Sequence, residues 1–384
     1  MSAYFIAPRI AAGTASLEQL TSVGATRAAV VVDPALVSSE RVQRVVESLS
    51  ESSASVETLP WVGTEPTLAS VEALAERIRA FAPDWIVAVG GGQTLDGAKA
   101  GWIRYARPEL DLRALTPLEP LRLRAAAGFV AVPSTSGSGC DVAWTAMVRG
   151  PDGSAVELAS RELVPDWSLL DPQFPATMPP DVTVDTAAEL LAHAVEALLS
   201  EWANPFSDAH AREAIATTFA QLPNVVRHPT DLDARLALHH AATFAGLAAS
   251  NAQFGAAHAI AQALGPETDR SYGRLLGTVL PYVAEFNYPS ARERLERAAG
   301  VLGPAAGKDR SAVAERIRSL LGPLGIPRTL REAGVPESVL TSRRPTVVAR
   351  ARAASATVAN PRVASEEEYA RLIACAFDGV AVMF

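Results

Sequence analysis

The sequence predicts a molecule in two parts, an α/β domain built on a parallel sheet followed by an all-helical domain. In the first 175 residues, short apolar runs alternate with longer segments of helical periodicity, as in successive βαβ units. Beyond them, alanine-rich helical patterns continue without a convincing strand. The proline-rich segment PQFPATMPP at 172–180 separates these two sequence patterns, because proline continues neither a helix nor a strand. We therefore expect domains at 1–175 and 176–384.

Individual elements of the first part follow from periodicity. Three apolar runs, AAVVV, WIVAV and FVAV, have the length and composition of buried strands. Two segments between them carry apolar residues at helical spacing. The expected strands are 28–32, 85–89 and 129–132, and the expected helices are 40–49 and 68–81.

Composition narrows the class of function. A chain of 384 residues, 49% hydrophobic, can form two domains with sizeable cores. The net charge of −8 argues against a nucleic-acid partner, since a phosphate backbone requires a concentrated basic face. There is no long apolar run, no secretory leader and no CxxC spacing. We expect a cytoplasmic protein with no membrane partner, whose thiols at Cys140 and Cys375 are reduced.

The segment DWIVAVGGGQTLDGAKA (84–100) carries the strongest functional signal. A buried strand ends in Gly90, Gly91 and Gly92, and a helix begins near Thr94 or Leu95. Backbone N–H groups and the positive end of that helix therefore face whatever lies over the glycines. The arrangement predicts an anion site suited to a pyrophosphate. A tight turn without a ligand is the alternative interpretation.

Three further features suggest where ligands bind. The loop AVPSTSGSGCDVAW (131–144) follows an apolar strand, and its small residues let a phosphate or a nicotinamide ring approach closely. Asp33 ends the first strand, where it can bind a ribose diol and repel a 2′-phosphate, or simply start the turn before Pro34. In AAELLAHAVE, Glu189 and His193 stand four residues apart on one face of a helix, as a pair of metal ligands would.

The order of these motifs resembles the iron-containing (group III) alcohol dehydrogenase superfamily, which includes the maleylacetate reductases. The resemblance covers most of the chain. The motifs that carry it are VVVDPALV, TEPTLASVEAL, GGGQTLDGAKA, VPSTSGSGCD, VPDWSLLDPQFPATMPP, AAELLAHAVEAL, NPFSDAHAREAI, FAGLAASNAQFGAAHAIAQALG, TVLPYVAEFN and ANPRVASEEEYARLIACAF.

This resemblance implies the dehydroquinate synthase-like architecture, in which a Rossmann-like α/β domain binds a nicotinamide cofactor and a helical domain holds iron or zinc. It implies a homodimer that acts on a small molecule. It also implies that Asp33 favours NADH, with NADPH as the alternative. The cofactor-binding residues that we predict on this basis are Asp33, Gly90, Gly91, Gly92, Thr94, Asp96, Thr135 and Ser138.

The metal-binding pattern of that superfamily is altered in this chain. Its usual ligands are an aspartate, a histidine four residues later and two further histidines, and the matching positions here are Glu189, His193, His258 and Tyr272. A glutamate can bind a cation through oxygen, whereas a neutral phenol is a poor ligand. We interpret these four residues as a converted metal site that still forms the active centre.

Two more positions depart from the superfamily pattern. Gln262 replaces a histidine, and Ala155 replaces a lysine that often lies near the nicotinamide ribose. The maleylacetate reductases also depart from the metal-binding aspartate and reduce a keto acid without a metal. In such a site hydrogen-bond donors must polarise the carbonyl, and His193, His258 and Tyr272 are the candidates. We therefore predict an NAD(P)H-dependent reductase of an aldehyde or keto group, with weak or absent metal dependence.

Several alternatives stay open. Glu189, His193 and His258 can suffice for a catalytic metal, and related cyclases use a glutamate with two histidines. Those cyclases clamp phosphorylated sugars with several lysines, but Lys99 is the only lysine near any site in this sequence. A non-redox lyase, another cyclase or a binding protein on the same scaffold is a further alternative.

The remaining charged candidates have two interpretations each. Arg270 and Arg274 can bind a substrate carboxylate, which favours an acidic substrate, or they can be surface charges. The other four histidines are expected to be structural or on the surface: His210, His228, His239 and His240.

Overall fold

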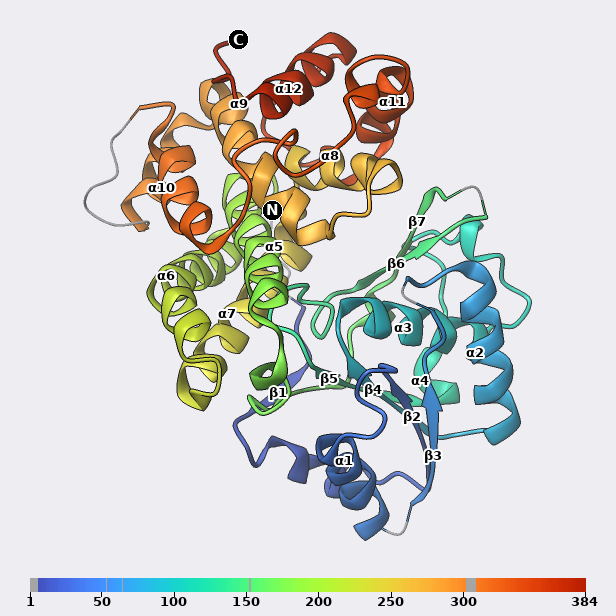
Figure 1. Cartoon of the computed structure of the whole chain (residues 1–384). Coiled ribbons are helices and arrows are strands. Elements are labelled where there is room, and N and C mark those ends of the chain that lie inside the picture. The colour runs from blue at the N-terminus through green and yellow to red at the C-terminus, as the bar shows by residue number, and fades with distance from the viewer. Residues whose placement is uncertain (1–5, 53, 64, 152, 302–308) are drawn as a thin grey trace. The chain divides into compact units, whose positions relative to one another are not determined.

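The computed structural model describes residues 6–52, 54–63, 65–151, 153–301 and 309–384. The chain separates into two compact units (Figure 1). The N-terminal unit comprises Ile6–Met178 and Thr230–Thr243, and the C-terminal unit comprises Pro179–Pro229 and Phe244–Phe384. Residues 230–243, which the predicted boundaries assign to the second domain, therefore make their contacts with the first unit.

A parallel sheet of six strands forms the centre of the N-terminal unit, in the order β1-β8-β5-β4-β2-β3. The three predicted strands are its neighbouring strands β5, β4 and β2. An antiparallel hairpin, β6 with β7, lies outside the main sheet. The strands are β1 (Arg9–Ala12), β2 (Arg27–Val32), β3 (Ser55–Pro60), β4 (Trp85–Gly90), β5 (Gly128–Pro133), β6 (Thr145–Arg149), β7 (Ala155–Ala159) and β8 (Trp167–Leu170).

Helices cover both faces of the sheet, which explains why its central strands are apolar on both sides. In β2, Ala29 and Val31 pack into the core beneath α2 and α3, while Val30 and Val32 pack into the core beneath α1. The layers are visible in Figure 1. The α-helices of this unit are α1 (Glu40–Glu51), α2 (Leu68–Phe81), α3 (Gly92–Ala106) and α4 (Leu123–Ala126).

The C-terminal unit is helical, and no strand follows β8 in the described part of the chain. Helix α5 packs against α6 and α9, and its second half, from Leu190 to Leu199, is fully buried. The remaining helices are α5 (Pro180–Leu199), α6 (Pro205–Arg227), α7 (Leu232–Ala252), α8 (Ala256–Leu264), α9 (Tyr272–Val301), α10 (Ala312–Leu321), α11 (Arg344–Ala353) and α12 (Glu366–Asp378).

The start of α9 crosses α5 so closely that only glycine fits at the crossing. A Cβ on Gly273 would lie 2.0 Å from the backbone carbonyl oxygen of Asp185. Because that oxygen belongs to α5, it cannot move aside as a side chain would. This contact fixes the position of Tyr272, the first residue of α9, against α5.

We expect Gly273→Ala to destabilise the protein by about 1–3 kcal/mol, because the added methyl group forces two helices apart. Gly300→Ala is the matched control, since it lies in the same helix and its Cβ would meet nothing within 4 Å. The control should be neutral or slightly stabilising. Urea unfolding followed by circular dichroism measures both, and equal stabilities would contradict this account of the crossing.

Candidate functional site

Three loops follow neighbouring strands at one edge of the sheet. The chain leaves β2 toward β3 and leaves β4 toward β5, on opposite sides, so the strand order reverses between β2 and β4. In open α/β sheets such a reversal opens a crevice at the carboxyl ends of the strands, where ligands bind. Asp33 follows β2, the glycines at 90–92 follow β4, and the loop from Ser134 follows β5. The topology therefore brings three predicted cofactor segments to one crevice.

The glycine loop presents the bare start of α3 to this crevice. Helix α3 begins at Gly92, somewhat earlier than expected, and its N-cap residue Gly91 supplies no side-chain hydrogen bond. The first N–H groups of the helix thus depend on another acceptor, such as a phosphate.

The three glycines are required by close packing. A Cβ on any of them would press on a neighbouring side chain: on Thr94 for Gly90 (2.6 Å), on Thr135 for Gly91 (3.3 Å) and on the Ser138 hydroxyl for Gly92 (2.7 Å). The loop after β5 therefore packs directly against the glycine loop. Thr135 and Ser138 remain partly accessible, as residues that line a cofactor must be.

Asp96 lies within α3 and its carboxylate is used inside the protein. One oxygen accepts a hydrogen bond from the Met147 N–H of β6 at 3.0 Å. Burial raises the pKa of Asp96 to about 6, although the charge of Lys99 acts against this rise. Lys99 is itself buried and donates to the carbonyl of Ala143 at 2.5 Å. The pair thus anchors the hairpin to α3, and a role of Asp96 in cofactor binding stays a prediction.

Asp33 both closes a turn and faces the crevice. Its Oδ1 accepts the N–H of Ala35 at 3.0 Å, so the turn that we considered as an alternative is present. Its own N–H donates to the carbonyl of Val89, which ties the end of β2 to β4. The turn uses one carboxylate oxygen, and a role of the other in binding a ribose stays a prediction.

In the C-terminal unit, the structure brings three of the four predicted catalytic residues together. The ring centroids of His193 on α5 and His258 on α8 are 4.7 Å apart. The ring of Tyr272 meets His258 edge-on at 6.1 Å, and Phe254 stacks on His258 at 4.3 Å. Glu189 lies half-buried, one helical turn before His193. Burial and the neighbouring His258 hold the pKa of His193 well below its usual range, so its imidazole is neutral.

A residue that the sequence analysis did not single out, Glu196, organises this cluster. Its buried carboxylate accepts hydrogen bonds from the N–H groups of Gly255 (3.0 Å) and Ala257 (2.6 Å), so it caps the start of α8. Its Oε2 also lies 2.5 Å from Nδ1 of His258. Since a carboxylate only accepts, Nδ1 carries the proton and Nε2 is the nitrogen left for a ligand. The available signal was a charged residue inside the apolar run AVEALL.

The donor set is incomplete for a divalent metal. In the described residues, no group of three His, Cys, Asp or Glu side chains is placed to hold a metal ion. The histidine pair alone has suitable nitrogen donors, and the neutral phenol of Tyr272 is a poor third ligand. The residues therefore fit the metal of the resemblance only in part.

Arg274 does not offer a free guanidinium to a substrate. It pairs with Asp185 at 2.9 Å and donates to the carbonyl of Gly325 at 3.1 Å. These contacts tie the start of α9 to α5. Arg274 is therefore not available to bind a substrate carboxylate.

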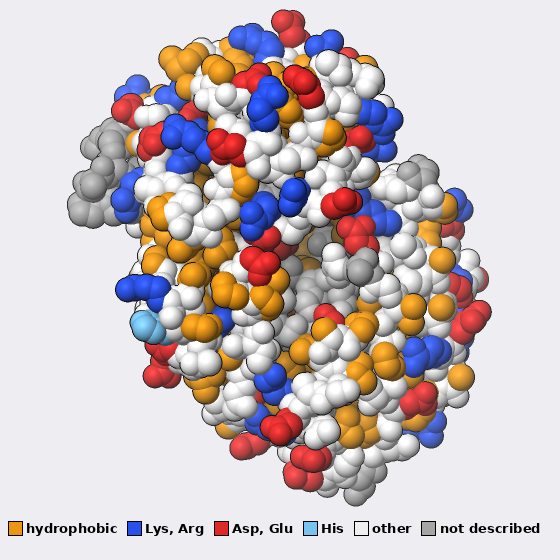
Figure 2. Space-filling model, viewed as in Figure 1, with side chains coloured by type: hydrophobic (Ala, Val, Ile, Leu, Met, Phe, Trp, Pro, Cys, Tyr) orange, Lys and Arg blue, Asp and Glu red, His pale blue; other side chains and the backbone are white. Residues whose placement is uncertain are grey.

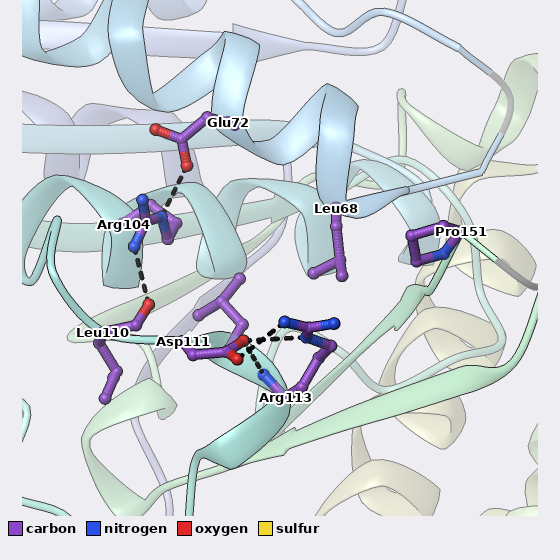
Figure 3. Close-up of a pocket in the computed structure, with 8 residues that line it drawn as sticks. Leu68, Glu72, Arg104, Leu110, Asp111, Arg113 and Pro151 are labelled. Atoms are coloured by element: carbon purple, nitrogen blue, oxygen red, sulfur yellow. Dashed lines mark hydrogen bonds and ion pairs between the residues drawn. The ribbon is translucent and has the colours of Figure 1, made fainter.

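A shallow hollow of about 370 Å³ in the N-terminal unit contains none of the predicted site residues (Figure 3). Its charged groups are satisfied locally: Arg104 pairs with Glu72 at 2.7 Å, and Arg113 pairs with Asp111 at 3.0 Å. It is lined by Leu68, Glu72, Arg104, Leu110, Asp111, Leu112, Arg113 and Pro151. The charged side chains that line this hollow are all paired with one another, so none is available to bind a charged ligand, and we do not assign the hollow a function.

The surface is consistent with a small-molecule enzyme. On the face drawn in Figure 2, acidic and basic side chains are interspersed, so this face offers no concentrated basic region. None of the helices in the described part of the chain has the length and apolarity needed to span a bilayer.

A glycine loop at the reversal point of a parallel sheet, followed by a helical unit, is typical of nicotinamide-dependent oxidoreductases. Two family models match this chain. Iron-containing alcohol dehydrogenase matches residues 7–172, and the C-terminal part of the same family matches residues 183–377. The chain belongs to the iron-containing alcohol dehydrogenase family.

Individual relatives agree. The NADPH-dependent butanol dehydrogenase of Clostridium saccharobutylicum is 32% identical over 99% of both chains. An alcohol dehydrogenase of Thermococcus barophilus is 34% identical over 85% of this chain and 87% of its own. The solved iron-containing alcohol dehydrogenase of Thermococcus thioreducens superposes with a TM-score of 0.90 at 30% identity, over 98% of this chain and 100% of its own. These findings confirm the predicted superfamily, the fold class and an NAD(P)-dependent oxidoreductase.

Proposed function

We propose that this protein reduces an aldehyde or keto group on a small substrate with NADH, and that its turnover depends weakly or not at all on a bound metal. One observation carries the proposal: the contact of Glu196 with His258, beside His193 and Tyr272, builds a hydrogen-bonding site where the superfamily places a metal. A small substrate is supported by the butanol dehydrogenase named above.

The reaction needs hydride at the carbonyl carbon and a proton at its oxygen. The glycine loop would hold NADH, which would supply the hydride when bound. In the C-terminal unit, the hydroxyl of Tyr272 polarises the carbonyl by hydrogen bonding, and His258 protonated at Nε2 donates that proton to the developing alkoxide. Glu196 balances the charge of the imidazolium through Nδ1. Neutral His193 and the stacked ring of Phe254 keep water from the donor.

A metal-dependent dehydrogenase is the second candidate, and one observation favours it. Glu196 holds the Nδ1 proton of His258 and so presents an Nε2 lone pair, as carboxylates do behind metal-binding histidines. In that case the metal would need a third ligand, and Glu189 is the candidate from the sequence, although the structure does not place it with the two histidines to hold an ion. A non-redox enzyme or binding protein is the remaining alternative. A likeness to maleylacetate reductases, a homodimer and a cytoplasmic location stay predictions from the resemblance.

The preference for NADH rests on Asp33, although the butanol dehydrogenase relative is NADPH-dependent. A carboxylate at the end of β2 binds a ribose diol and repels a 2′-phosphate. We expect NADH to bind at least about tenfold more tightly than NADPH. Titration of the dialysed protein, followed by nicotinamide fluorescence, measures both dissociation constants.

Asp33→Asn is the matched variant, because an asparagine oxygen can still accept the N–H of Ala35 while the charge is lost. This variant should gain affinity for NADPH and keep most of its affinity for NADH. If the wild-type protein bound neither nucleotide, the reductase proposal would fail and the non-redox alternative would take its place.

The role of Glu196 predicts a specific loss of turnover. Glu196→Gln keeps the volume and one acceptor for the start of α8, but it cannot balance an imidazolium. We expect kcat for aldehyde reduction to fall about 10–100-fold, with the dissociation constant for NADH unchanged. Glu201→Gln, an exposed carboxylate just beyond α5, is the control. An unchanged kcat in folded Glu196→Gln protein would show that His258 is not the proton donor.

A further inference from the structure

The loop after β5 is fastened to α7 at two points one helical turn apart. Both points involve residues of the N-terminal unit, because Thr230–Thr243 makes its contacts there. His239 meets one end of the loop and Thr243 meets the other. His239, which we expected to be structural or on the surface, is only 1% exposed.

At the first point, Nδ1 of His239 lies 2.9 Å from the hydroxyl oxygen of Ser136. Both side chains are buried. Burial, reinforced by His240, lowers the pKa of His239 to about 3, so the hydrogen bond is made by a neutral ring. The bond therefore holds Ser136 without placing a charge in the core.

At the second point, the buried carboxylate of Asp141 joins three elements. It accepts hydrogen bonds from the hydroxyl of Thr243 at 3.1 Å and from the hydroxyl of Ser168 on β8 at 2.8 Å. Asp141 stands at the end of the loop. The end of the loop is thus tied to α7 and to the sheet together.

The residues that pack on the glycine loop lie between these two points or directly before the first one. Ser138 lies between Ser136 and Asp141 and contacts Gly92, and Thr135 directly precedes Ser136 and contacts Gly91. Ordering a loop residue costs backbone conformational entropy. A loop that is already ordered in the free protein loses less entropy when a ligand binds, and this preorganisation increases the affinity for the ligand.

We propose that His239 and Thr243 are positioning residues, which hold the loop 134–141 in the shape that receives the nicotinamide cofactor. The inference rests on the cofactor site in the proposed function. Packing alone would not require these polar groups, since a leucine and a valine would fill similar volumes in a buried helix.

The test compares variants that lose each hydrogen bond with variants that keep it. Thr243→Val and His239→Leu remove the bonds. Thr243→Ser retains the hydroxyl, and His239→Asn retains an amide that can donate or accept a hydrogen bond. We expect each loss to raise the dissociation constant for NADH about 3–10-fold, and the conservative variants to restore it to within about twofold. The KM for the carbonyl substrate should not change. Thr217→Val on α6 controls for the loss of a helical threonine hydroxyl.

Ser136→Ala gives a second, smaller perturbation of the same contact. In a double-mutant cycle, Ser136→Ala combined with His239→Leu should weaken NADH binding no more than either change alone, because both remove one bond. If all these variants bound NADH as the wild type does and lost only thermal stability, the contacts would be structural. That result would overturn this inference and leave the proposed function standing. Failure of the wild type to bind NADH would instead overturn the proposed function and this inference with it.

Discussion

The hydrogen bonding of one buried carboxylate, that of Glu196, is the interaction on which the helical unit depends. A charge in this position would be costly unless strong donors met it. Here the N–H groups of Gly255 and Ala257, the positive end of α8 and the ring of His258 all converge on the two oxygens. The start of α8 and the orientation of His258 are consequently set by the same group. The group that caps α8 therefore also orients the ring of His258.

In the N-terminal unit the constraint is one of space, because the backbone of the glycine loop itself must come close to the ligand. The glycines at 90–92 have no room for a Cβ because Thr94, Thr135 and Ser138 already fill that space. Two loops from neighbouring strands are therefore fitted to each other before any cofactor arrives. Together with the bare start of α3, this rigid surface suits a pyrophosphate. In the reaction that we propose, the helical unit supplies the hydrogen-bond donors for the carbonyl.

The sequence could predict those features that depend on residues close together in the chain. Strands β2, β4 and β5 are continuous apolar runs, and the glycine loop lies at a strand end, so both were predictable. The short strands β1 and β8 and the polar edge strand β3 lack such a signal and were missed. Glu196 was missed for another reason: its partner His258 lies 62 residues away in the sequence. The contact of His239 with Ser136, 103 residues apart, could not be predicted either, although His239 itself was expected to be structural or on the surface. Contacts at such separations depend on packing that no local pattern encodes.

In the proposed reaction, hydrogen-bond donors of this protein take the place of a metal at the carbonyl. Bound iron and zinc should be measured together with the turnover of NADH and a small aldehyde in the same protein sample, before and after chelation. We expect turnover to persist when the metal content falls far below one ion per chain, and added iron or zinc to have little effect. Turnover that falls in proportion to bound metal and returns when metal is restored would contradict this expectation and would favour the metal-dependent dehydrogenase.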